Sequence, residues 1–138
     1  MAQNTSPIFP LTPRVSWVAI SGSNSAVNGT GTVNTVFTAQ TNGSRIDYLS
    51  LAASGSAATT VLRVFLNNGS ANSTATNNIL FTEYALPSST AATTIPAGPT
   101  LTIPMNISLP NGYNVNVTLG TSVTSSGGWN VTAVGGDY

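Results

Sequence analysis

The clearest hydrophobic pattern in the chain is a strict alternation in its last third. Apolar residues take every second position from 101 to 109 and from 113 to 119, with the turn-forming run Pro110-Asn111-Gly112 between them. A period of two is typical of a strand with one buried face, so this pattern predicts a β-hairpin. Because Pro104 has no backbone donor, its strand is expected at a sheet edge or with a bulge. The expected core face comprises Leu101, Ile103, Met105, Ile107, Tyr113, Val115, Val117 and Leu119.

Shorter β-prone runs, bounded by Gly, Asn, Ser and Pro, occur along the rest of the chain. They span residues 15–20, 32–39, 45–53, 59–66, 79–86 and 129–134. No segment has the apolar period of a helix, and the Ser, Thr, Asn, Pro and Gly content of residues 70–78 and 87–100 favours loops. About eight strands predict an all-β fold, an antiparallel β-sandwich over residues 15–138 that is most naturally jelly-roll-like. An up-and-down barrel is the alternative architecture.

Residues 1–14 have a different character, with Pro7, Pro10 and Pro13 spaced by threes. Proline removes backbone donors and fixes an extended path, so we expect an extended N-terminal arm and no strand here. The apolar side chains between the prolines are costly to leave in water. The arm is therefore expected to dock on a neighbouring subunit or on a capsid, or to fold back on its own sandwich. The candidate partner-binding residues are Ile8, Phe9, Pro10 and Leu11.

The composition lacks three residue types that catalytic and metal-binding sites use most often. The 138 residues include no Cys, no His and no Lys, and the net charge is zero. The six charged residues are Arg14, Arg45, Arg63, Asp47, Glu83 and Asp137. A neutral surface of short polar side chains gives little repulsion between copies and loses little rotamer entropy when buried, which suits a protein docked in an assembly. A secreted domain adapted to a particular medium is the alternative.

Without His, a Ser-His-Asp site cannot form, and no Cys-based or His-based metal site is available. Paired-carboxylate catalysis would need Asp47 and Glu83 together, and we expect instead that Arg63 is satisfied by one or both of them. Calcium binding has no run of acidic residues to support it. We therefore expect neither an enzyme nor a cofactor.

Other partners are also constrained by the sequence. Three arginines at zero net charge give no nucleic-acid footprint, and no secretory signal or apolar run of membrane-spanning length is present, so we expect a soluble chain made in a cytoplasm. Aromatic residues could form a sugar-binding platform, although we expect most of them in the core. These residues are Trp17, Trp129, Tyr48, Tyr84, Tyr113 and Tyr138.

Several segments in order carry a resemblance to a known group. They are residues 37–39 and 42–47, residues 62–69 with their Asn-Gly turn, residues 109–113, and the ending Gly135-Gly136-Asp137-Tyr138. Over roughly residues 37–138 the chain resembles the small head decoration, or cement, proteins of tailed bacteriophages. The resemblance implies a β-sandwich, homotrimers on the capsid exterior and binding to the major capsid protein. It brings no catalytic residue, and the very low charge and the proline-spaced arm depart from that group.

Two kinds of function remain open at this point. The first is a structural virion protein that decorates or cements a phage capsid. The second is a carbohydrate-binding or adhesive module of a phage fibre or a cell surface. Trimers without glycan affinity would favour the first, and glycan binding through an exposed Trp or Tyr patch would favour the second.

Overall fold

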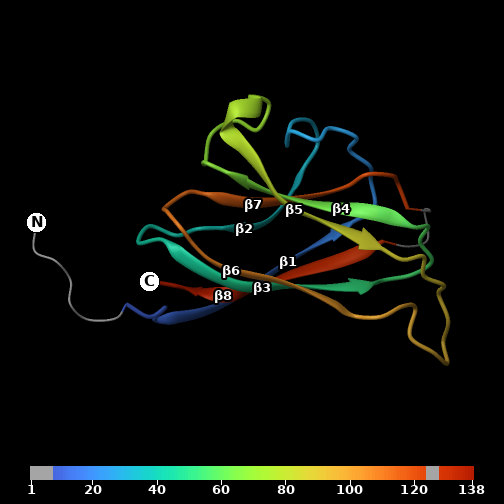
Figure 1. The fold of residues 1–138 in the computed structure, drawn as a ribbon. Helices are drawn as coiled ribbons and strands as arrows, with labels where there is room; N and C mark the ends of the chain where they lie inside the picture. Colours follow the sequence, from blue (N-terminus) through green and yellow to red (C-terminus); the bar gives the residue numbers. More distant parts are fainter. Residues whose placement is uncertain (1–7, 124–127) are drawn as a thin grey trace, which may run out of the picture.

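The computed structural model describes residues 8–123 and 128–138, and in them the chain forms two antiparallel four-stranded sheets (Figure 1). The expected all-β sandwich is confirmed. A single 3-10 turn, η1, is the one helical element among the described residues, and it lies in the stretch 70–78 that we expected to be a loop. The elements are β1 (Thr12–Ile20), β2 (Asn34–Thr38), β3 (Ser44–Ala53), β4 (Thr60–Asn67), η1 (Ala75–Asn77), β5 (Asn78–Leu86), β6 (Leu101–Leu109), β7 (Asn114–Leu119) and β8 (Trp129–Asp137).

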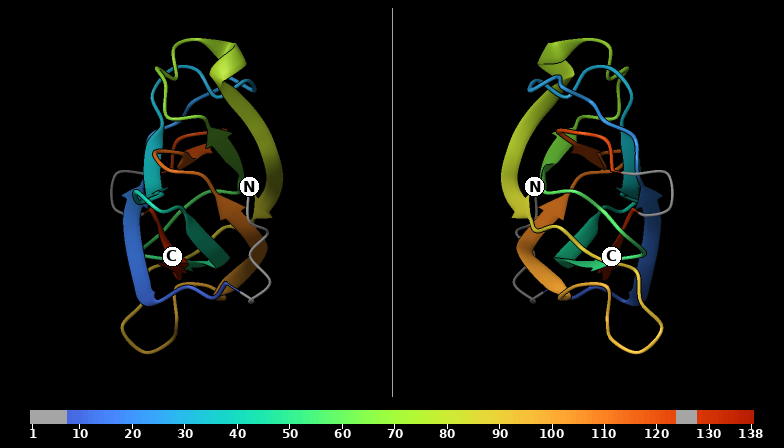
Figure 2. Two further views of the ribbon diagram at one scale, coloured as in Figure 1. Left: turned by 90° about the vertical axis from the view of Figure 1, so that its left-hand side faces the viewer. Right: turned by 90° about the vertical axis from the view of Figure 1, so that its right-hand side faces the viewer.

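Strand pairing follows a nested scheme. β4 pairs with β5, β3 with β6, β2 with β7 and β1 with β8, all antiparallel. Successive nested pairs alternate between the sheets, which gives the orders β1-β8-β3-β6 and β2-β7-β4-β5. This is the topology of a long hairpin rolled into two layers, the eight-stranded jelly roll. End-on views show the edge strands β1 and β2 on one side of the molecule and β5 and β6 on the other (Figure 2).

The alternating hairpin packs as its sequence predicts. All eight residues of its expected core face belong to the core cluster between the sheets or pack against it. Pro104 lies in an edge strand, and the pairing of β3 with β6 also shifts register beside it, where Asn106 has a φ of 51°. Both features expected for Pro104 are therefore present.

Asn116 and Thr118, expected to face outward on β7, are nevertheless buried. They do face away from the core, but the β1–β2 and β4–β5 connections cover this outer face (Figure 1). Asn72 in the second connection donates to the carbonyl of Gly31 in the first at 2.8 Å, and Phe65 on the outer side of β4 is fully buried. The middle of the β2-β7-β4-β5 sheet, at β7 and β4, is thus covered on both faces, whereas the edge strand β5 stays largely exposed.

Both chain ends are more regular than the sequence suggests. β1 begins at Thr12, so Thr12, Pro13 and Arg14 pair with β8 although the sequence placed them in the arm of residues 1–14. Pro13 is tolerated because β1 is an edge strand. Gly135 and Gly136, which follow the run 129–134 expected as the last strand, lie inside β8. A Cβ on Gly135 would collide with the carbonyl oxygen of Arg45, so glycine allows β8 to approach β3.

Candidate interaction surface

The outer side of β1 is unusual, because the polarity of the strand is inverted over residues 14–17. Val15 and Trp17 face solvent, and Trp17 is 75% exposed, while Arg14 and Ser16 point inward. At the sandwich edge Arg14 Nη1 donates to the carbonyl of Thr38 at 2.7 Å, and Ser16 Oγ donates to that of Val36 at 2.6 Å. These bonds to β2, with Ile20 buried in the core at the end of the strand, fix the orientation of β1 and leave Val15 and Trp17 in water.

The apolar positions form one continuous line along β1 and the segment before it. Leu11 is 83% exposed, and Pro13, Val15, Trp17 and Ala19 are exposed at every second position after it. We call these five residues the β1 stripe. An exposed strand face made wholly of apolar side chains is the kind of surface that marks an interaction site.

The stripe continues across its sheet. The strand register forms one row across the four strands. Val15 of β1 pairs with Val134 of β8, which pairs with Tyr48 of β3, and Tyr48 pairs with Pro104 of β6.

The next row joins Trp17 to Thr132, Ser50 and Thr102. No residue of these two rows carries a charge. The charged residues of this face, Arg45 and Asp47, pair with each other at 2.8 Å, and this hydrogen bond raises the pKa of Arg45. The middle of the outer face is therefore neutral.

The arm residues expected to bind a partner are found next to this stripe. Pro10 packs on Gly136, where a Cβ added to the glycine would lie 2.7 Å from the Cβ of Pro10. The Leu11 amide donates to the Asp137 carbonyl at 2.8 Å. Ile8 and Phe9 are exposed, with Phe9 at 71%. The root of the arm is thus attached to β8, whereas its apolar side chains remain uncovered.

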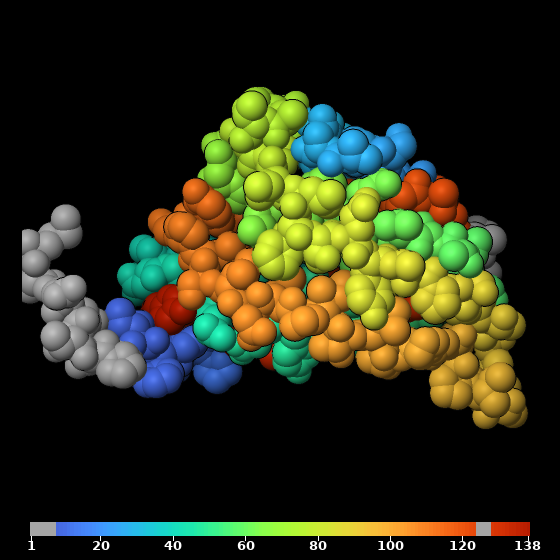
Figure 3. Space-filling view, viewed as in Figure 1, coloured from blue at the N-terminus to red at the C-terminus, as the bar shows by residue number. Residues whose placement is uncertain are grey.

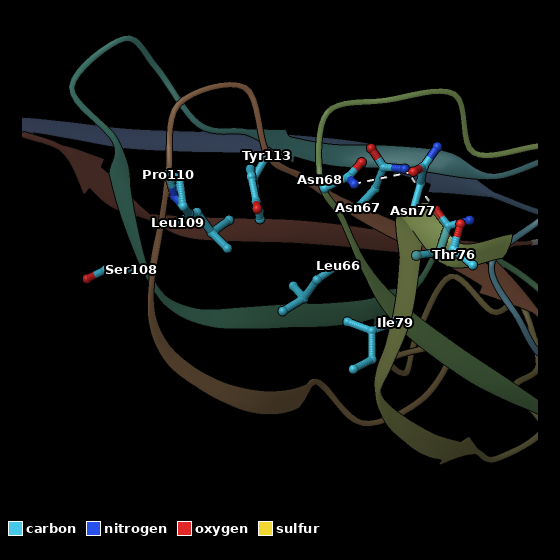
Figure 4. A pocket seen from close by; sticks show the side chains of 11 residues that line it. Leu66, Asn67, Asn68, Thr76, Asn77, Ile79, Ser108, Leu109, Pro110 and Tyr113 are labelled. Carbon is cyan, nitrogen blue, oxygen red and sulfur yellow. Dashed lines mark hydrogen bonds between the residues drawn. The ribbon is translucent and has the colours of Figure 1, made fainter. Parts of the chain in front are cut away.

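A groove opens between the sheets near the same end of the sandwich (Figure 4). Its volume is about 320 Å³, and we call it the end groove. Its apolar lining comprises Leu66, Ile79, Leu109, Pro110 and Tyr113, and its polar lining comprises Asn67, Asn68, Thr76, Asn77, Asn78 and Ser108.

The charged residues do not assemble into a catalytic pair. Asp47 lies on β3 and Glu83 on β5, so the two carboxylates belong to different sheets. Arg63 binds Glu83 at 2.8 Å, as expected for one carboxylate, while Asp47 binds Arg45. Among residues 8–123 and 128–138, no group of three metal-ligating side chains occurs, and no helix is long and apolar enough to cross a membrane.

Only half of the six candidate aromatic residues lie at the core, fewer than the sequence led us to expect. Trp129 is fully buried, and Tyr84 and Tyr113 pack against the core. Tyr138 is half-buried, with its hydroxyl 2.6 Å from Ser108 Oγ. Trp17 and Tyr48 are exposed on one sheet face. Sequence reasoning did not identify the role of Trp17, although the polar Arg14 and Ser16 that alternate with Val15 and Trp17 were a visible signal.

Comparisons with known proteins give little further information. No protein-family model matches the chain, and no curated protein matches it. Among solved structures, a chain in the structure of the infectious bursal disease virus Gx strain is similar at a TM-score of 0.36 and 15% sequence identity. That similarity covers 92% of this chain and 34% of the other, so this chain spans about a third of its length. With a TM-score this low, we argue the function from the surface of the chain itself.

Proposed function

We propose that this chain is a structural virion protein that decorates or cements the capsid of a tailed bacteriophage by binding the major capsid protein, as a homotrimer. The observation that carries the proposal is the β1 stripe with its neutral sheet face. The partner comes from the resemblance of residues 37–138 to phage head decoration proteins. The jelly-roll fold is compatible with this role, since viral capsid domains use it, but lectin domains and cupins use it too.

Burial of the stripe supplies the driving force for docking. Fully burying one Val, Leu, Ile, Phe or Met side chain is worth roughly 1.5–3 kcal/mol. Trp is among the residues that most often dominate a protein interface, and Trp17 stands on the edge strand β1, at the end of an uncharged row of this face. A partner that covers Leu11, Val15 and Trp17 therefore gains apolar contact without desolvating a charge.

The edges of the two sheets argue for docking through a face and against strand addition. Pro13 interrupts the donors of β1, and the pairings that involve the edge strands β2, β5 and β6 each contain a register shift. Prolines and bulges on edge strands are the devices by which sheets avoid edge-to-edge pairing. The partner is therefore expected to lie flat on the β1-β8-β3-β6 sheet.

Co-sedimentation with phage heads tests this function. Purified protein is incubated with heads that lack it, from the phage that encodes it, and the heads are pelleted. We expect co-sedimentation that persists in high salt, because the docking face is neutral and salt screens only charges. Failure to sediment with the heads, or release by about 0.5 M salt, would contradict the proposal. Light scattering of the free protein tests the trimer, for which the uncharged surface supplies the support.

Carbohydrate binding is the second candidate, and one observation favours it. The exposed indole of Trp17 shares its row with the hydroxyl groups of Thr132 and Ser50. An aromatic face can stack on a sugar ring while hydroxyl groups hydrogen-bond to it. A screen against neutral oligosaccharides, repeated with Trp17→Ala, distinguishes the two functions. Glycan binding that needs Trp17, without binding to heads, would favour the second.

A further inference from the structure

We propose that copies of this chain are joined by their arms, with Ile8 and Phe9 of one copy seated in the end groove of the next copy. This inference rests on the self-association within the proposed function, but it does not depend on a capsid. It names the segment that crosses between copies and the surface that receives it.

The end groove has an apolar floor that its own copy leaves open. Ile79 is 64% exposed, although its strand partner Leu66 packs against the core. Leu109, Pro110 and Tyr113 complete the floor from the end of β6 and the turn after it. In Figure 4 the side chains of Leu66, Ile79 and Leu109 point into the same space. The groove thus presents an open apolar surface between β5, the edge strand of one sheet, and β6, the edge strand of the other.

Each of the four asparagine amides in the polar lining, or rim, of the groove already donates a hydrogen bond within the chain. The Asn67 amide donates to Asn78 Oδ1 at 2.8 Å, and that of Asn68 donates to Asn77 Oδ1 at 3.3 Å.

The remaining two rim amides are also engaged. Asn77 donates to the Ala71 carbonyl and Asn78 to the Asn72 carbonyl, each at 2.9 Å. These bonds hold the rim in place, and none of the lining residues is charged. A ligand recognised mainly by hydrogen bonds or charge therefore finds few free donors, whereas an uncharged apolar segment fits.

The arm has the chemistry that such a groove requires. No charged side chain precedes Arg14, and Ile8 and Phe9 stand between Pro7 and Pro10. Pro13 belongs to strand β1, so the spacing that matters is that of Pro7 and Pro10. It matches the three-residue turn of the polyproline II helix, a conformation that docks in grooves lined by aromatic residues. The prolines also lower the entropy that the arm loses on docking. Tyr113 and Pro110 supply the corresponding surface in the groove.

The root of the arm directs it toward another copy. Pro10 rests on Gly136 and the Leu11 amide is bound to the Asp137 carbonyl, so that among the described arm residues Ile8 and Phe9 lie beyond these attachments. In Figure 3 the first described residues, in blue, lie at the end of the molecule where the β6–β7 turn also lies. In this position Phe9 is exposed and outside the groove of its own copy.

Exchange of arms between copies can also produce a closed assembly. Ile8 borders a depression with Asn42, Ser108 and Tyr138, and Ser108 also lines the end groove. The departing arm and the receiving groove are therefore adjacent on each copy but are different surfaces. Contacts between different surfaces of identical copies run head to tail, and they close into a ring when the rotation between copies permits. A trimer is such a ring.

Disulfide trapping tests the proposal directly, because the chain contains no Cys. Phe9→Cys and Ile79→Cys are prepared separately, mixed and mildly oxidised. Both positions are exposed, so neither substitution should impair folding. We expect a species of twice the chain mass on a non-reducing gel, several-fold more abundant than in the control mixture of Phe9→Cys with Ile95→Cys. Ile95 is equally exposed but lies in the β5–β6 connection, outside the groove.

The double variant Phe9→Cys/Ile79→Cys separates exchange between copies from insertion within one copy. Exchange predicts linked dimers and larger species, whereas a product that stays at the mass of one chain would overturn the proposal. A mixture that links no more than the Ile95→Cys control would also overturn it. Either of these two results would reject the arm–groove contact but not the binding of phage heads through the β1 stripe. Conversely, a protein that cross-links as expected but does not bind heads would reject the proposed function and not the arm–groove contact.

Discussion

Ser16 and Trp17 leave β1 in opposite directions, and the polar side chain is the one that points inward. Ser16 Oγ donates to the Val36 carbonyl at 2.6 Å, whereas the indole of Trp17 is 75% exposed. A shift of the strand by one residue would bury the indole but would lose this bond to β2. The chain therefore holds Trp17 on the surface through the polar contacts of its neighbours, which is the reason for assigning the indole to an interface.

The core register is tested by Val117→Asp. Val117 is fully buried between the sheets, so the substitution places an unpaired carboxylate in the core. We expect a loss of more than about 4 kcal/mol in the free energy of unfolding and failure to fold. Val27→Asp, at an exposed position, serves as the control and should fold normally. Thermal melting followed by circular dichroism checks both, and a stable Val117→Asp protein would show that the register is reversed.

The close approach of β8 to β3 is tested by Gly135→Ala. The added methyl group would collide with the backbone carbonyl of Arg45, which cannot move without disturbing the sheet. We expect a loss of about 3 kcal/mol in unfolding free energy, within the range of strained or overpacked positions. Gly22→Ala is the matched control, because nothing lies within 4 Å of its added carbon. Equal denaturation midpoints for the two variants would contradict the account.

The arm is tested by deleting residues 2–9, which preserves Pro10 and all of β1. Because Ile8 and Phe9 are exposed, we expect the melting temperature of the sandwich to change little. Light scattering should show the mass of the truncated protein falling to that of one chain. If the truncated protein unfolds, the arm belongs to its own core. If its oligomeric mass is unchanged, the arm does not join copies.

Metal ions and moderate changes of pH should leave the fold unaffected. The sequence has no His or Cys, and no other side chain has an ordinary pKa between about 6 and 9. No group of three metal-ligating side chains is present in the described parts of the chain. We expect the same melting temperature across this pH range, with calcium or with a chelator. A rise on adding calcium would reveal a site that this account lacks.

The sequence pattern predicted the fold where burial of one strand face was the only factor that set the pattern. Alternation in residues 101–119 predicted the hairpin and its core face, because a two-residue period has only one interpretation in a half-buried strand. It did not predict the burial of Asn116 and Thr118, which depends on two distant connections meeting over the sheet.

The surface could be predicted only in part. The prolines pointed to the arm. Arg14 and Ser16 alternate with Val15 and Trp17, but the buried Ile20 lies on the same side of the strand as the two polar residues, so the alternation gives only a weak signal for an exposed Trp17. The last strand was expected to end at Val134, before the Gly135-Gly136 pair. The need for glycine at Gly135 comes from the carbonyl of Arg45 on another strand, which no local pattern reveals. The end groove arises from segments that are far apart in the sequence, and no local signal marks it.

The central claim is that the β1 stripe is the docking surface, and Trp17→Ser tests it most directly. The protein is compared with Val27→Ser, which removes an exposed apolar side chain from outside the stripe. Both variants should melt within a few degrees of the wild type, and their affinity for phage heads is then measured by co-sedimentation. Removing an interface Trp typically costs at least about 2 kcal/mol, so we expect Trp17→Ser to bind roughly 30-fold more weakly. We expect unchanged binding for Val27→Ser, and equal affinities for the two variants would show that the β1 stripe is not the docking surface.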